Sequence, residues 1–271
     1  MSFTDAKSEK ENAEYAEVKQ STKNFDERWA AKKSRAFFLG GLSDCANAMK
    51  NHGSDPKWCG RAKMVKYGAD LAESGETDLL SGIQIYDRDP SIPKLLNGCE
   101  RCVRPQLGGK AFVKELMDHK YVLNFDGAGN WSRRMSLLLR SGSVVVKAES
   151  PGYQFYEFGL EPGVHYVPFD PAVGKDDPGN LRPRLEWLAE FDDVAKELAQ
   201  RAESFGDNCL SEHSINDFVY EILAEYGRLQ RGRPIKYQTI DVSQCLDRKT
   251  CRGVLEPCFG FTFQRKQKGL R

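Results

Sequence analysis

The chain lacks any apolar run of about 18 residues or more, the length that a membrane-spanning helix requires. Residues 1–20 are hydrophilic, so we expect neither a signal peptide nor a membrane segment in this chain, and no compartment follows from it. The 40 basic and 39 acidic residues leave a net charge of only +1. This balance gives no overall attraction to nucleic acid or to an anionic membrane, so any anion binding must be local.

Histidine is scarce, and no second close cysteine pair accompanies Cys99 and Cys102. A zinc finger needs two such ligand pairs, so we expect no metal site. Cysteine itself is not scarce: the chain has 8, an even number that suits disulfide bonds in an oxidising compartment. Buried free thiols are the alternative for several of them.

The order of short apolar runs and helical patterns predicts an α/β fold with a doubly wound, Rossmann-like sheet and helices at its C-terminal end. With 271 residues, of which 40% are hydrophobic, the chain can bury one sizeable core or two small ones. We expect strands at 35–39, 83–86, 121–125, 143–147 and 164–168, and helices at 57–71, 110–119, 185–205 and 215–229. No internal repeat is visible.

The most informative segment follows the apolar run 121–125. Gly127 and Gly129 allow the backbone to approach a ligand closely, and Ser132 is a good N-cap for a helix that would carry Arg133 and Arg134 in its first turn. Cations at a helix N-terminus are unfavourable by about 0.3–1 kcal/mol, which indicates a neutralising anion such as phosphate. A solvated face is the alternative explanation for paired arginines.

A strand at 143–147 would complete a βαβ unit, and ligands of such sheets bind beyond the carboxyl ends of the strands. This arrangement also fits an NAD-binding domain, in which Glu149 could hold the ribose, although arginines in the turn suit that cofactor poorly. Nucleic-acid binding through the basic, cysteine-containing tail at 231–271 has little aromatic interleaving to support it.

Three motifs resemble the CAP10, or glycosyltransferase 90, family. They are N-F-D-G-x-G-x-W-S-x-R from Asn124, SGSVVVK at 141–147 and L-x-P-x-VHYVPFD at 160–170, and weaker similarity occurs at 29–40, 61–80 and 187–229. The resemblance implies that residues 28–230 form the Rossmann-like, nucleotide-sugar-binding half of a GT-B type transferase. The polar composition of residues 1–27 predicts a disordered or loosely helical leader. The resemblance also implies glucose or xylose transfer from a UDP-sugar to a hydroxyl of a protein or glycan acceptor, inverting and metal-independent, with no further cofactor. Family members work in the lumen of the ER or Golgi.

The same resemblance implies roles for individual residues. Arg134, or Arg133 if the turn is counted forward from Asn124, would contact the pyrophosphate of the donor. Arg61 could assist it, and His165 would be structural. The remaining residues would line the turn (Asp126, Gly127, Gly129, Trp131 and Ser132) or pack against the nucleoside (Tyr153 and Phe155).

The chain also departs from the family pattern. Leu39 stands where the family has an arginine, Gln154 where many members have an acidic residue, and Gly163 where they have tryptophan. The family's acceptor-binding half, with its catalytic aspartate, would precede residue 29, where only about 28 mostly polar residues stand. Two hypotheses follow: a transferase that is represented incompletely or completed by another piece, or an impaired remnant that binds UDP without turnover.

Overall fold

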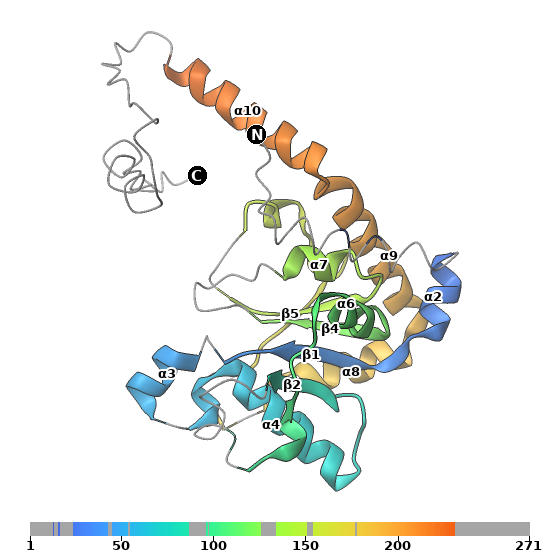
Figure 1. Ribbon diagram of the computed structural model, residues 1–271, viewed down its shortest axis with the longest axis vertical. Helices are drawn as coiled ribbons and strands as arrows, with labels where there is room; N and C mark the ends of the chain where they lie inside the picture. The colour runs from blue at the N-terminus through green and yellow to red at the C-terminus, as the bar shows by residue number, and fades with distance from the viewer. Residues whose placement is uncertain are drawn as a thin grey trace, which may run out of the picture. The chain divides into compact units, whose positions relative to one another are not determined.

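The structure is a computed structural model (Figure 1). Apart from the isolated positions 13 and 16, it describes residues 24–42, 45–53, 55–86, 96, 98–125, 134–150, 154–176 and 178–230. The chain divides into two compact units, Met1–Val219 and Tyr220–Arg271. Of the second unit, the described residues are 220–230, the last part of helix α10 (Glu212–Gln230).

Six parallel strands form one sheet in the order β3-β2-β1-β4-β5-β6. Figure 1 shows β2, β1, β4 and β5 as successive neighbours. This is the Rossmann order, in which the direction of winding reverses between β1 and β4. The strands are β1 (Lys33–Gly40), β2 (Gly82–Tyr86), β3 (Val103–Arg104), β4 (His119–Asn124), β5 (Val144–Ala148) and β6 (Val167–Phe169).

Helices cover both faces of the sheet, as buried parallel strands require. On one face, Phe38, Ile83 and Leu123 pack in a cluster with residues of α4 and α8. On the other face, Phe37 and Val122 pack with residues of α6 and α7. The helices are α2 (Phe25–Ala31), α3 (Cys45–His52), α4 (Gly60–Ser74), α6 (Gly109–Met117), α7 (Met135–Leu139), α8 (Leu181–Glu190) and α9 (Asp192–Cys209), with 3-10 turns η1 (Pro56–Trp58), η2 (Glu100–Cys102) and η3 (Glu157–Gly159).

The expected α/β fold is confirmed, but two helix predictions were wrong in detail. The segment expected as one helix at 185–205 is two, because the backbone leaves helical geometry at Phe191 (φ −105°, ψ 62°). The next residue, Asp192, is held there by Trp29 Nε1 at 3.0 Å and Lys120 Nζ at 2.6 Å. Helix α7 begins only at Met135, with Arg134 as its N-cap, so Arg134 precedes the first turn of the helix.

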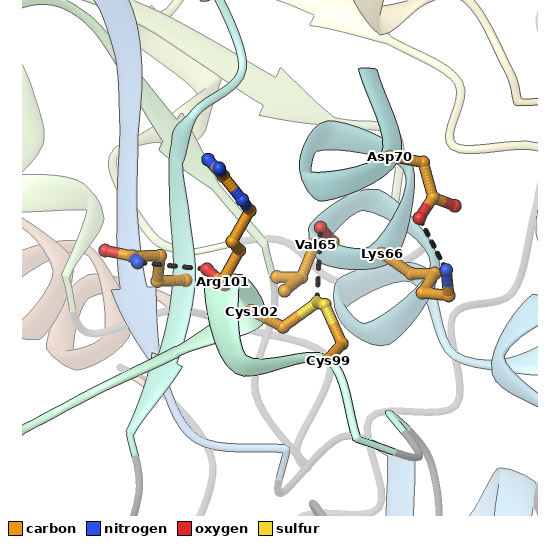
Figure 2. Close-up of a disulfide and its surroundings, with 7 residues drawn as sticks. Val65, Lys66, Asp70, Cys99, Arg101 and Cys102 are labelled. Atoms are coloured by element: carbon orange, nitrogen blue, oxygen red, sulfur yellow. Dashed lines mark hydrogen bonds and ion pairs between the residues drawn. A yellow bond between two sulfur atoms is a disulfide. The ribbon is translucent and has the colours of Figure 1, made fainter. Parts of the chain in front are cut away.

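Two disulfide bonds are present, and the sequence alone did not predict which cysteines they join. One links Cys45 to Cys59, and the other links Cys99 to Cys102, which therefore do not form half of a zinc site. Figure 2 shows the second disulfide beside Val65 of α4. Among the described cysteines, Cys209 is a free, exposed thiol.

His119 opens β4 in the core, where it is 2% exposed, stacks on Phe37 and donates from Nδ1 to the Glu115 carbonyl at 2.6 Å. Burial lowers its pKa, and Lys33 and Arg35 act in the same direction, while the carbonyl and the carboxylate of Glu115 oppose them. The folded pKa therefore lies below the unfolded value of about 6.5. On acidification the unfolded chain takes up this proton first, so the free energy of unfolding falls below about pH 6.5.

We therefore expect His119→Gln to remove one component of this acid slope, at most about 1.4 kcal/mol per pH unit. Chemical denaturation at pH values between about 5 and 7.5 measures it. His213→Gln is the control, because the His213 side chain is 87% exposed. Equal slopes for the parent and His119→Gln would contradict the assignment.

Candidate functional site at the switch point of the sheet

The carboxyl ends of β1 and β4 meet where the winding of the sheet reverses. Gly40 ends β1 and Gly41 follows it, while Phe125 follows the last residue of β4. Helices leave these two strands toward opposite faces, and a switch point of this kind is where open α/β sheets bind their ligands. The two glycines keep side chains from filling the end of β1.

Arg134 reaches this position from the start of α7. Its guanidinium carbon lies 5.3 Å from the ring centroid of Phe38 and 5.4 Å from that of Phe112, both within the range of cation–π attraction. A Cβ on Gly40 would lie 3.4 Å from Arg134 Nη1 and 2.8 Å from the Phe38 ring. The glycine therefore leaves room for ring and guanidinium over the end of β1.

Arg61, on the first turn of α4, approaches the same ring from the other helix layer. It is 7% exposed, and its guanidinium carbon lies 5.6 Å from the Phe38 centroid. Nη1 donates to the Gly41 carbonyl at 2.7 Å, and Nη2 donates to the Phe125 carbonyl at 3.1 Å. Arg61 thus bridges the chain after β1 and the chain after β4. Its direct role toward a donor stays a prediction.

Phe155 is described, 46% exposed, and makes two ring contacts. It stacks on Phe218 of α10 at 5.4 Å and meets Tyr156 edge-on at 5.1 Å. An exposed aromatic face of this kind can pack a nucleoside, which stays a prediction. The other expected site residues lie outside the described residues: Asp126, Gly127, Gly129, Trp131, Ser132, Arg133 and Tyr153.

The three departures from the family pattern have physical explanations. Leu39 is fully buried in the core cluster on the α6 and α7 face of the sheet. Gln154 accepts a hydrogen bond from the Tyr156 hydroxyl at 2.9 Å, and burial raises the pKa of that phenol. Gly163 has a φ of +76°, which a tryptophan would adopt only with strain.

His165 is a hydrogen-bonded wall residue, as expected. Its Nδ1 accepts from the Glu161 amide at 3.0 Å, which leaves the proton of the neutral ring on Nε2. The ring packs against Phe205 at 5.2 Å. This arrangement accounts for His165 without a role in proton transfer.

Two buried polar side chains were not singled out from the sequence. Asn124 is the last residue of β4, and Lys147 is its register partner on β5; they are 1% and 7% exposed. Lys147 Nζ lies 3.6 Å from Glu157 Oε2. A polar residue at the end of an apolar strand is the sequence signal that could have found them.

Neither a metal cluster nor a membrane span is found in the part of the chain that the structure describes. No group of three or more His, Cys, Asp and Glu side chains there could hold a metal ion. No helix among these residues is both long enough and apolar enough to cross a bilayer.

The strand order defines a Rossmann-type α/β domain. Its switch point has two glycines and is basic, because two guanidiniums lie over one aromatic ring there. The chain belongs to glycosyl transferase family 90, whose family model matches residues 8–254.

Curated relatives match about half of the chain. Protein O-glucosyltransferase 3 of Homo sapiens is 30% identical over 129 residues, which are 46% of this chain and 24% of that protein. Protein O-glucosyltransferase 1 of Homo sapiens is 32% identical over 159 residues, or 52% of this chain and 39% of that protein. The chain thus spans well under half the length of these relatives. A solved glycosyltransferase from Rickettsia africae ESF-5 is 12% identical, with a TM-score of 0.46, over 76% of this chain and 51% of that one.

Proposed function

We propose that this chain is the donor-binding half of a GT-B type glycosyltransferase that moves glucose or xylose from a UDP-sugar to a hydroxyl of a protein or glycan acceptor. The observation that carries the proposal is the Arg134 guanidinium over Gly40 at the switch point. Family membership supports the reaction class. The names of the O-glucosyltransferase relatives favour glucose and a protein acceptor.

The chemistry requires stabilisation of the UDP diphosphate as it leaves. A guanidinium fork binds phosphate oxygens bidentately and can neutralise this developing charge without a metal ion. We therefore propose a metal-independent reaction, and on the resemblance to the family we propose inversion at the sugar carbon. Donor binding unchanged by EDTA, and a product of opposite anomeric configuration seen by NMR, would support these two points.

Replacing Arg134 by methionine is expected to weaken UDP binding by about 1.5–3 kcal/mol, or roughly 10- to 150-fold, because charge-assisted hydrogen bonds are lost. Methionine retains much of the packing against Phe38 and Phe112, so the fold should be preserved. Isothermal titration of the full chain with UDP measures the change.

Arg201→Met is the matched control, because Arg201 is exposed on α9 and pairs there with Glu197. It removes the same charge from the chain and should leave UDP affinity unchanged. Equal affinity of the parent and Arg134→Met would remove Arg134 from the site. No UDP binding by the parent chain would refute the proposal.

The second candidate function is UDP binding without turnover. The observation that favours it is Leu39, which occupies the family's arginine position and is buried in the core, where it supplies no charge. UDP release from UDP-glucose in the presence of a protein acceptor separates the two functions. Release shows turnover and contradicts the remnant.

We also propose that the protein works in an oxidising compartment such as the lumen of the ER or Golgi. Two disulfide bonds within one domain support this, since disulfides are rare where glutathione keeps thiols reduced. Alkylation of the protein isolated from cells would test it, since protected cysteines at 45, 59, 99 and 102 are expected.

A further inference from the structure

The side chain of Asn124 is buried without a hydrogen-bond partner. The residue is 1% exposed, and neither Oδ1 nor Nδ2 has a partner in the structure. An unsatisfied buried polar group is destabilising, and an apolar residue of similar shape would avoid that loss. Native proteins keep few such groups, and a missing ligand or water is a common reason.

Lys147 lies beside Asn124 and brings hydrogen-bond donors to the same place. The two residues are paired in register on adjacent parallel strands, so their side chains leave the same face of the sheet. An ammonium has three N–H donors. Among the described residues, Lys147 Nζ has the ion pair with Glu157 at 3.6 Å, which is longer than a hydrogen bond.

The charges of this cluster favour a neutral ligand group over a phosphate. Asn124 is uncharged, and Lys147 and Glu157 have opposite charges, so the cluster is neutral as a whole. The Glu157 carboxylate would repel a phosphate oxygen. A hydroxyl group donates to the carboxylate or to Asn124 Oδ1 and accepts from the ammonium or from Asn124 Nδ2. Two neighbouring hydroxyls would satisfy all three side chains.

The position of the cluster fits a sugar ring attached to a diphosphate at the switch point. Adjacent strands lie about 4.8 Å apart, so β4 and β5 are about 5 and 10 Å from the end of β1. Arg134 lies over the end of β1 at Gly40. A ring one or two bonds beyond the diphosphate would therefore reach Asn124 and Lys147.

We propose that Asn124, Lys147 and Glu157 bind the vicinal hydroxyls of a sugar ring of the nucleotide-sugar donor. The inference rests on the proposed function and adds these residues to it. The ring is either the ribose or the transferred hexose, since both present neighbouring hydroxyls.

Binding of three ligands to the full chain tests the proposal: UDP, 2′-deoxy-UDP and UDP-glucose. Asn124→Leu should weaken sugar binding roughly 5- to 20-fold, as expected for one or two lost hydrogen bonds. It should leave the thermal midpoint unchanged or raised, because the unsatisfied amide is removed. Asn124→Ala serves as the second variant if leucine does not fit, and thermal unfolding verifies that each variant is folded.

The pattern of loss identifies the ring. If the ribose is bound, Asn124→Leu lowers the affinity for UDP. The parent then binds 2′-deoxy-UDP more weakly than UDP, and Asn124→Leu lowers the affinity for 2′-deoxy-UDP only a little further. If the hexose is bound, the variant loses affinity for UDP-glucose and keeps that for UDP. Parent-like binding of UDP and UDP-glucose by both Asn124 variants, with Arg134→Met impaired, would overturn this inference and leave the proposed function intact. Failure of the parent to bind either nucleotide overturns both.

Discussion

Replacement of Arg28 by methionine is expected to lower the free energy of unfolding by about 3–5 kcal/mol. Arg28 of α2 forms a two-pronged pair with Glu203 of α9, with Nη1–Oε1 and Nη2–Oε2 distances of 2.7 and 2.8 Å. The side chains are only 11% and 10% exposed. Methionine in place of the guanidinium would take the two-pronged pair away from the buried Glu203 carboxylate, and removing one member of a buried ion pair is strongly destabilising.

The double variant Arg28→Met/Glu203→Met is the matched control. Replacing both members of a buried ion pair by apolar residues is often neutral or stabilising, so the double variant should recover most of the loss. Urea denaturation of the parent, both single variants and the double variant gives the coupling energy directly. A loss below about 1 kcal/mol in Arg28→Met would show that solvent already screens the pair.

The strands could be predicted because their signal is local. Short apolar runs in the sequence correspond to β1, β2, β4 and β5 within a residue or two. The strands β4 and β5 are buried on both faces, as in a parallel sheet, whereas β2 alternates between buried and half-buried residues. The start of β6 was placed too early: residues 164–166 form a turn and an isolated bridge before Val167. The break at Phe191 was missed because distant partners, Trp29 and Lys120, hold the following aspartate.

The site could be predicted only in part, because some of its contacts join residues that are far apart in the sequence. Arg134 and Arg61 were both named from the sequence, and the structure brings both guanidiniums to the Phe38 ring. The contacts of Arg61 could not be predicted, because the carbonyls that it bridges belong to two loops 84 positions apart, at Gly41 and Phe125. Asn124 was quoted within a motif, but its lack of partners is visible only in the packed core.

Opening the Cys45–Cys59 disulfide is expected to lower the free energy of unfolding by about 3 kcal/mol, the chain-entropy value for a loop of about 15 residues. The cysteines are 14 positions apart, and the bond ties α3 to Cys59, the N-cap of α4. Cys45→Ala is the suitable variant, because it leaves the Cys59 sulfur free to cap α4. Non-reducing urea denaturation measures the loss.

Cys99→Ala is the matched comparison, since Cys99 and Cys102 are only 3 positions apart. The same chain-entropy relation gives about 2 kcal/mol for so short a loop, so Cys45→Ala should lose more stability than Cys99→Ala. With a reductant, the parent and Cys45→Ala should converge, apart from the small cavity left by the missing sulfur. If their difference persisted under reducing conditions, it would arise from packing around residue 45, which is fully buried, and the cross-link would not be its source.

A UDP titration of Cys45→Ala extends the test to the site, because α4 also carries Arg61, whose two hydrogen bonds bridge the switch point. Lower affinity in this variant at a temperature where it remains folded would show that the disulfide helps to position the proposed donor site.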